Sequence, residues 1–438
     1  MIRPPRPHKV RPPRGEAPPA PRSLLVVHAA ELLTLRGPPG PRSREAASEL
    51  GVVEDGAVFA EGDEIVDVGP STQVLRRHPN AGTTLDASGK VVLPGLVDAH
   101  THFVFAGSRE REVEWKAQGL SYAEIAARGG GILHTVRSTR EASESELQRL
   151  GLQRLLSFVG YGTTTVEGKS GYGLTTVDEA KILRASVEAG RSAGVDVVPT
   201  FLGAHAVPEE FVGRTDAYVD IVMDQMLPAI AADRLADFCD VFVDEGYFSP
   251  DQGRRVLRKA GGLGLPSKVH ADELADTGGA ALAAEFRARS ADHLLHASDA
   301  GIDAIARAGV IATLLPATSL VSKMPYADGR RLLAAGVPVA LGTDFNPNTW
   351  CDSMQLAIAL ACHHNGLLPA QAITAATINA AFAVGRGDSV GSLEPGKLAD
   401  LVMLDAPSYH HLGYRMGGNL AEAVVKRGRI RKGRSLTR

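Results

Sequence analysis

The sequence predicts an α/β protein with two parts, a (β/α)8 barrel of the TIM type and a small β-sandwich domain built from both ends of the chain. Two observations carry this prediction. Beyond about residue 94, short apolar runs alternate with helical stretches, a pattern typical of parallel strands joined by crossover helices. Eight such runs occur, the strand number of a (β/α)8 barrel. They are residues 96–100, 163–167, 197–205, 239–245, 267–273, 291–296, 310–316 and 337–344.

The composition fits a large protein without a strongly charged surface. The 438 residues, 44% of them hydrophobic, are enough for one large and one small domain. A formal charge of -3 gives no general affinity for nucleic acid or acidic membranes, and no apolar run reaches the ~18 residues that span a bilayer. Cys239, Cys351 and Cys362 have no C-x-x-C spacing. We therefore expect a cytoplasmic protein without disulfides or a thiolate metal site.

The two ends of the chain differ from its centre. Residues 1–22 are rich in Pro and Arg and lack an apolar centre, which predicts a disordered tail and no secretory signal. Residues 23–93 contain short Val and Ile runs between Gly and Asp turns, which indicates a small β unit. Since residues 390–438 return to β character, we expect them to pair with 23–93 and flank a barrel of residues 94–389.

Helices are predicted between the barrel strands. Residues 121–140 and 143–159 have helical patterns, and the second begins at Ser143 with Glu146 three residues on, a capping-box arrangement. A further helical tract covers residues 352–385.

Nearly every predicted barrel strand ends in a His, Asp or Glu. An ionisable residue has little structural use at the tip of a buried strand. The carboxyl ends of barrel strands converge on one rim, so these side chains should share a cavity. They are His100 and His102, Glu167, His205, Glu245, His270, His296 and Asp344.

Four of these side chains form a coherent metal set. His100 and His102 lie two residues apart at a strand end and so point to the same side. An isolated His-x-His is more often structural, but His270 and Asp344 add ligands from later strands. The set suits one zinc or iron ion per chain with an open position, and such an ion lowers the pKa of water toward neutrality.

Two residues near this set have candidate catalytic roles. Glu273 lies three residues after His270, where a carboxylate could move a proton from water to a leaving nitrogen. The alternative is a solvated loop acid, which Asp272 fits better. His293 could donate a hydrogen bond to a substrate oxygen, whereas His296 could merely close the strand.

Two segments beyond strand ends carry candidate binding residues. Arg109 follows the His-x-His, where a guanidinium suits bidentate capture of a carboxylate, although alone it would be a solvated charge. Tyr172 lies in the glycine-bracketed segment EGKSGYG, which predicts a sharply folded loop that presents the ring to the cavity. A turn with Tyr172 on the surface is the alternative. Lys169 falls in the same segment, and we place it in a turn beyond the strand, away from the metal.

Several motifs together resemble a known family. PGLVDAHTH, VHADE, GTD and GSLEPGKLADLVMLD resemble the amidohydrolase superfamily. Within it, HTHFVFAGSRE, TTVEGKSGYGL, FLGAHAVPEE and GTDFNPN resemble the imidazolonepropionase family of histidine degradation. The resemblance covers nearly the whole chain from about residue 24.

The resemblance implies a site and a reaction. The implied ligands of a single zinc or iron ion are His100, His102, His270 and Asp344. The implied substrate contacts are Arg109, Tyr172, His205, Glu273, Asn346, Asn348 and Thr349. Many members have Gly at 348, and Asn348 tolerates the left-handed backbone that a Gly can adopt. The implied enzyme, a homodimer, opens 4-imidazolone-5-propanoate at a cyclic amide C–N bond to give N-formimidoyl-L-glutamate.

In the expected mechanism, Arg109 binds the substrate carboxylate and hydroxide attacks the ring carbonyl carbon. The metal and His293 stabilise the oxyanion, and Glu273 or Asp344 delivers a proton to the ring nitrogen. Two alternatives remain open at this point. One is an aminohydrolase that deaminates a nitrogen heterocycle, whose substrate would have no carboxylate for Arg109. The other is a non-catalytic scaffold, a kind of relative that typically lacks metal ligands.

Overall fold

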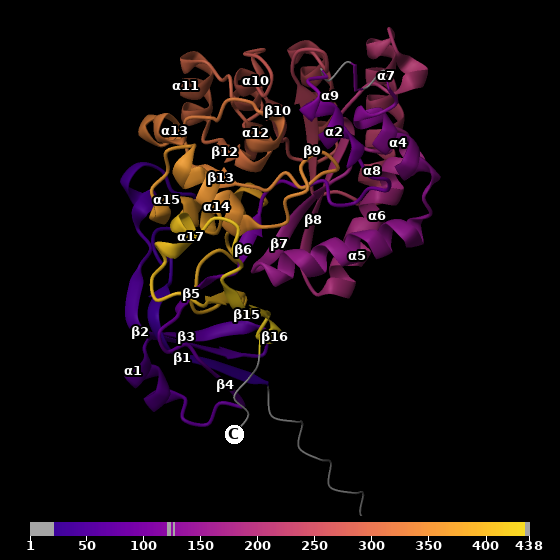
Figure 1. The fold of residues 1–438 in the computed structure, drawn as a ribbon. Helices are drawn as coiled ribbons and strands as arrows, with labels where there is room; N and C mark the ends of the chain where they lie inside the picture. Colours follow the sequence, from indigo (N-terminus) through magenta and orange to yellow (C-terminus); the bar gives the residue numbers. More distant parts are fainter. Residues whose placement is uncertain (1–21, 121–123, 126–127, 434–438) are drawn as a thin grey trace, which may run out of the picture.

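The computed structural model describes residues 22–120, 124–125 and 128–433. The predicted tail up to residue 21, and part of the helix predicted over 121–140, lie outside these residues. The described chain forms two eight-stranded sheets, a barrel and a second sheet that lies below it in Figure 1. Arg22 already contacts the second sheet, because its guanidinium donates to Asp63 Oδ1 and to the carbonyl oxygen of Arg427, each at 2.9 Å.

The barrel contains eight strands, each at a place that the sequence predicts. Neighbouring strands pair in parallel in chain order. Near the carboxyl ends, the peptide N–H of Asp344 donates to the carbonyl oxygen of His100 at 3.0 Å and draws the first and last strands together. The prediction of a (β/α)8 barrel is confirmed. The strands are β6 (Leu96–Asp98), β7 (Thr163–Lys169), β8 (Asp196–Ala204), β9 (Phe238–Val243), β10 (Val269–Ala271), β11 (Ser290–His293), β12 (Ile311–Leu314) and β13 (Val339–Leu341).

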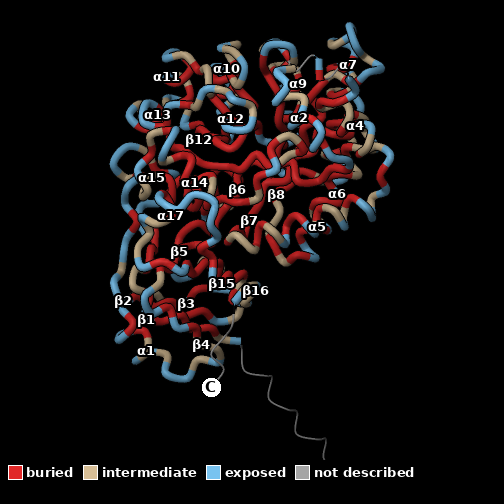
Figure 2. The backbone as a smooth tube through the Cα atoms, viewed as in Figure 1, coloured by how far each residue is buried: buried red, intermediate tan, exposed pale blue. Residues whose placement is uncertain are grey.

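Helices surround the barrel and cover its strands, so the residues of strands such as β7 and β9 are buried on both faces (Figure 2). The Ser143 half of the predicted capping box is present, since Ser143 Oγ accepts the N–H of Glu146 at 3.2 Å at the start of α5. The tract predicted over 352–385 divides into three helices, and Pro369 begins the second of them. The longer helices are α4 (Gly131–Glu141), α5 (Glu144–Gly160), α6 (Thr176–Ala193), α9 (Pro250–Gly262), α11 (Asp299–Ala308) and α14 (Met354–His363).

Shorter helices complete the outer layer and the connections. They are α1 (Ser71–Arg77), α2 (Arg111–Ala117), α7 (Thr215–Ile221), α8 (Leu227–Ala232), α10 (Gly279–Glu285), α12 (Pro316–Ser322), α13 (Gly329–Ala335), α15 (Pro369–Ala375), α16 (Ile378–Ala383) and α17 (His411–Tyr414), with 3-10 turns at Arg44–Ser48 and Glu209–Phe211 and a π turn at Val222–Met226. Among the described helices, none has the length and apolarity needed to span a bilayer.

The separate sheet combines both ends of the chain, as the sequence predicts. Its order is β16-β15-β14-β5-β1-β2-β3, with β4 beside β1, and the two ends meet where β14 pairs antiparallel with β5. Only Gly95 separates β5 from β6, and a Cβ there would lie 2.2 Å from Thr164 Oγ1. The strands are β1 (Ser23–Leu33), β2 (Val52–Glu61), β3 (Glu64–Pro70), β4 (Thr83–Asp86), β5 (Val91–Pro94), β14 (Leu401–Leu404), β15 (Ala421–Lys426) and β16 (Arg429–Lys432).

Candidate active site

The carboxyl ends of the barrel strands surround a cavity of about 650 Å³. Ten of the twelve predicted site residues line it: His102, Arg109, Tyr172, His205, His270, Glu273, His293, Asp344, Asn346 and Asn348. The other two, His100 and Thr349, are fully buried beside the cavity wall. Of the eight residues predicted at strand tips, His102, His205, Glu245, His270 and Asp344 line the cavity and His100 lies beside it, whereas Glu167 and His296 do not line it.

His100 has the hydrogen-bonding pattern of a metal ligand. Its Nδ1 lies 2.7 Å from Asp292 Oδ2, and both side chains are fully buried. Its Nε2 has no hydrogen-bond partner among the described residues and lies 3.6 Å from Asp344 Oδ1. A histidine that donates Nδ1–H to a carboxylate presents the lone pair of Nε2, as metal-bound histidines commonly do.

The other three predicted ligands lie around His100. His270 Nδ1 lies 2.9 Å from Asp240 Oδ2, a close charge contact without the hydrogen-bond geometry that His100 has with Asp292. His102 Nε2 lies 3.8 Å from Asp344 Oδ1. This donor set of imidazole nitrogens and one carboxylate fits a divalent metal ion.

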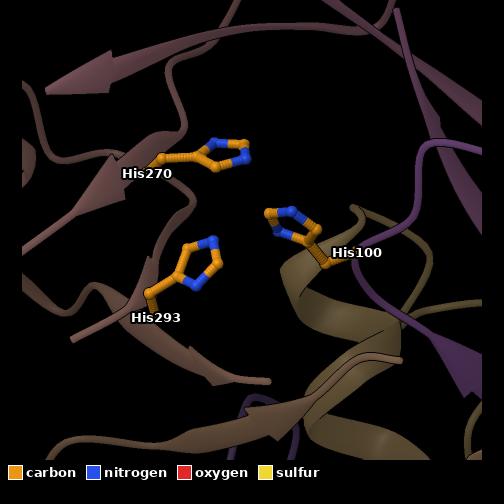
Figure 3. A group of neighbouring side chains, drawn as sticks. All are labelled: His100, His270 and His293. Carbon is orange, nitrogen blue, oxygen red and sulfur yellow. The ribbon is translucent and has the colours of Figure 1, made fainter. Parts of the chain in front are cut away.

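His205 and His293 also belong to this centre. Among the described residues, ligand atoms within 4.8 Å of one another form four overlapping sets, namely His100–His102–Asp344, His100–His270–His293, His102–His205–His270 and His100–Glu167–Asp292. Figure 3 shows the rings of His100, His270 and His293 converging from different elements. The first three sets join six side chains at one centre, two more than the predicted ligand set.

A buried charge cluster beneath the metal ligands corrects one prediction. Lys169 is the last residue of β7 and is fully buried, so the turn proposed for it is wrong. Its ammonium lies 2.7 Å from Asp240, 3.1 Å from Glu167 and 3.3 Å from Asp292, and Lys268 lies 2.8 Å from Glu167. Burial lowers the pKa of Lys169, but the carboxylates outweigh it and raise this pKa above its ordinary value. The cluster holds the two carboxylates that orient His100 and His270.

Glu273 and His293 face each other in the cavity wall. Glu273 Oε2 lies 3.6 Å from His293 Nε2, and the Glu273 side chain is 13% exposed. Burial raises the pKa of Glu273, and Asp344 and Asp244 raise it further. Burial lowers the pKa of His293, so its imidazole is neutral at pH 7.

The backbone around these residues is unusual. His293 has a φ of 76° and Asp344 a φ of 50°, left-handed values that are uncommon for residues other than glycine. Asp272 is not the solvated loop acid that it was expected to be, because it is fully buried and accepts backbone N–H groups from residues 277–280. His296 does not line the cavity.

Arg109 is held in place by a residue that the sequence analysis overlooks. Its Nε and Nη2 donate to the two carboxylate oxygens of Glu112, each at 2.7 Å, and the N–H of Gly131 donates to the same carboxylate at 2.7 Å. Arg109 is 9% exposed, so the solvated alternative is excluded. The signal for Glu112 is its spacing three residues after Arg109 at a helix start.

Tyr172 and His205 are placed by a tight loop after β7. Glu179 accepts the N–H groups of Gly171, Gly173 and Leu174 at 2.7 to 2.9 Å and so closes the loop. Gly171 has a φ of 110°, and a Cβ there would lie 2.7 Å from the Nδ1 of His205. That nitrogen lies 3.0 Å from the carbonyl oxygen of Gly171. The Tyr172 ring forms the cavity wall beside His205, as the sequence predicts.

The loop after Asp344 holds this carboxylate from both sides. Asn346 Nδ2 donates to Asp344 Oδ1 at 3.0 Å, and Thr318 Oγ1 donates to Oδ2 at 2.6 Å. Asn346 Oδ1 accepts the N–H groups of Asn348 and Thr349. Asn348 is not among the residues with positive φ, so this position does not require the left-handed backbone considered for it.

Comparisons with known proteins agree with this geometry. Residues 91–431 match the Amidohydrolase family. The chain is 51% identical to an imidazolonepropionase of Symbiobacterium thermophilum, over 94% of this chain and 97% of that protein. It is 49% identical to an imidazolonepropionase of Geobacillus kaustophilus, over 93% of this chain and 98% of that protein.

Solved structures share the fold at much lower sequence identity. The zinc complex of an atrazine chlorohydrolase from Arthrobacter aurescens superposes with a TM-score of 0.69 at 19% identity, over 94% of this chain and 95% of that chain. A zinc-bound adenosine deaminase from Xanthomonas campestris superposes with a TM-score of 0.66 at 21% identity, over 95% of this chain and 94% of that chain.

Proposed function

The chain belongs to the amidohydrolase family and, within it, to the imidazolonepropionases, hydrolases of histidine degradation, and on this premise we propose how its residues perform the reaction. The substrate is 4-imidazolone-5-propanoate and the product N-formimidoyl-L-glutamate. The observation that carries the assignment of residues is that one cavity holds both a metal-ligand centre and a buried guanidinium. A deaminase of an uncharged heterocycle has no use for that guanidinium.

His100, His102, His270 and Asp344 would hold one divalent ion. The unpartnered Nε2 of His100, with Asp292 on its other nitrogen, supports this assignment. Zinc and iron both suit the donor set, and two of the structural neighbours carry zinc. When bound, the ion would polarise the ring carbonyl and provide hydroxide at neutral pH.

Arg109 would bind the propanoate group, and Tyr172, His205, Asn346, Asn348 and Thr349 would shape the rest of the substrate site. Burial lowers the pKa of His205 to about 3, so this imidazole stays neutral, and since its Nδ1 donates to the carbonyl oxygen of Gly171, its Nε2 is left to accept one hydrogen bond. Because Arg109 is fixed by Glu112, the substrate ring would be oriented with its carboxylate toward α2.

Glu273 would be the proton carrier. It would take a proton from the attacking water and deliver it to the ring nitrogen as the C–N bond breaks, which balances the addition of one water molecule. Its raised pKa suits an acid–base group that works near neutral pH. Asp344 is the weaker choice because it is assigned to the metal ion and is held in place by Asn346 and Thr318. His293, neutral and facing Glu273, would donate a hydrogen bond to the developing oxyanion.

We also propose a cytoplasmic homodimer. The three cysteines are unpaired, in keeping with a reducing compartment, and the dimer follows from the family resemblance. Sedimentation velocity on the purified protein would show a monomer if the proposed homodimer is wrong.

One assay tests the reaction as a whole. Purified protein is mixed with freshly generated 4-imidazolone-5-propanoate, and loss of substrate absorbance, formation of N-formimidoyl-L-glutamate and release of ammonia are followed with and without a chelator. We expect chelator-sensitive ring opening without ammonia. Ammonia release would favour the aminohydrolase alternative, and no turnover in protein with one metal ion per chain would refute the substrate.

A further inference from the structure

The carboxylate-binding end of the cavity lacks net charge if Arg109 is its only cation. Nε and Nη2 of Arg109 lie 2.7 Å from the two oxygens of Glu112, and the two side chains are 6% and 4% exposed. The pair therefore has no net charge. A substrate carboxylate that enters this desolvated wall would meet the repulsion of Glu112 as well as the attraction of Arg109. Favourable binding of an anion calls for a further positive charge.

Lys116 supplies that charge. It lies on α2, seven residues after Arg109 and so on the same side of the segment, and it lines the same cavity. Its ammonium donates to Asn348 Oδ1, and among the described residues it forms no ion pair. Arg109, Glu112 and Lys116 together carry one net positive charge, enough to neutralise one carboxylate.

The pKa of Lys116 agrees with this placement. Burial lowers the pKa of its half-buried ammonium, Glu112 raises it and Arg109 lowers it, so the lysine lies in the field of both members of the pair.

Asn348 holds Lys116 without neutralising it. The amide oxygen accepts a hydrogen bond but carries no charge, and the amide nitrogen of the same side chain lies 3.4 Å from Ser322 Oγ. A glycine at 348 has no side chain and could not make this contact. On the basis of the proposed function, we propose that Lys116, positioned by Asn348, is a second carboxylate-binding residue of the active site and supplies its net positive charge.

The test compares two ligands that differ in a carboxylate, imidazole-4-propionate and 4-propylimidazole. Their dissociation constants are measured by titration calorimetry on the metal-loaded full-length protein. Lys116→Met removes the charge and keeps the aliphatic stem, and Lys116→Arg restores a charge. Asn348→Gly removes the positioning amide. Lys323→Met is the matched control, because it removes another lysine from the wall of the same cavity.

We expect Lys116→Met to raise the dissociation constant of imidazole-4-propionate about tenfold and to change that of 4-propylimidazole by less than about twofold. Lys116→Arg should recover most of the loss, and Asn348→Gly should show a smaller loss for the acid alone. With the substrate, Lys116→Met should raise KM much more than it lowers kcat. Lys323→Met should bind both ligands as the wild type does.

Several results would overturn the inference. An equal loss for both ligands in Lys116→Met would mean that the stem or the fold is affected, and no loss for the acid would exclude a contact. If Lys323→Met weakened binding of the acid as much as Lys116→Met does, the loss would reflect the total charge of the cavity and not a contact with Lys116. If Lys116→Met does not fold, Asn348→Gly decides by the same comparison.

Failure of the proposed function would look different. A wild-type protein that prefers the acid to the alkyl ligand but does not open 4-imidazolone-5-propanoate would refute the reaction and leave the carboxylate site in place. A wild-type protein without that preference would refute the carboxylate site itself.

Discussion

Replacement of Glu273 by Gln tests the proton-transfer assignment directly. The amide has nearly the same size as the carboxylate, which lies 3.6 Å from His293 Nε2 in the wild type, so it can still contact this ring. It cannot carry a proton from water to nitrogen. The loop should persist, because the peptide N–H of residue 273 donates to Asp244 at 2.7 Å. General acid–base catalysis contributes about 10²- to 10⁴-fold, so we expect turnover to fall by that factor. This corresponds to about 3–5 kcal/mol of transition-state free energy.

The same substitution has a predictable effect on stability. Burial raises the pKa of Glu273 in the folded protein above its ordinary value of 4.5. The folded state therefore binds this proton more tightly than the unfolded chain. The stability that the group contributes is fully present below pH 4.5 and is lost as the pH rises through the raised folded value. Since Gln does not titrate, the metal-free variant should gain Tm relative to the wild type as the pH increases from 5 to 8.

The assay follows loss of substrate absorbance at saturating and limiting substrate, with the metal content of each preparation measured in parallel. Glu245→Gln is the matched control, because it makes the same chemical change at an exposed glutamate of the same cavity. It should change turnover by less than about twofold. If Glu273→Gln keeps its metal and turns over as fast as the control, Glu273 has no part in proton transfer. If turnover and metal are lost together, Glu273 belongs to the ligand set.

Four other perturbations test the remaining assignments. Arg109→Ala should weaken substrate binding by about 2–5 kcal/mol, because it also leaves Glu112 unpaired, and unaltered substrate affinity would refute its carboxylate role. Asp292→Asn should lower metal affinity about 10- to 100-fold in competition with a chromophoric chelator, because His100 loses the carboxylate 2.7 Å from its Nδ1. Lys169→Met should lower the free energy of unfolding by about 3–5 kcal/mol in denaturant titrations, since buried carboxylates lose their cation. Removal of the metal should lower Tm and activity together, and its return should restore both; an unchanged Tm would argue against ligation by these core residues.

The positions of the barrel strands could be predicted because their signals are local. Each strand is a short apolar run, and its ionisable tip marks the carboxyl end, so His100, His270 and Asp344 could be placed on one rim before any contact was known. Lys169 was misplaced because Gly168 suggests the start of a turn. In the structure Gly168 lies within β7, and a Cβ there would lie 2.8 Å from the Phe103 ring. The glycine meets a packing requirement, which depends on a neighbour distant in sequence.

The sequence by itself determined the fold class, the β character of both chain ends and four candidate metal ligands, since periodicity, turn residues and strand tips are local properties. Only the tertiary structure decided which side chains act together. Asp292 reaches His100 across 192 positions of the chain, and Asn348 reaches Lys116 across 232. Such pairs depend on strand order and on closure of the barrel, and the effect of a charge depends on burial and on partners a few ångströms away. For that reason Arg109 could be predicted to bind an anion, whereas its neutralisation by Glu112 and the need for Lys116 became visible only in the folded protein.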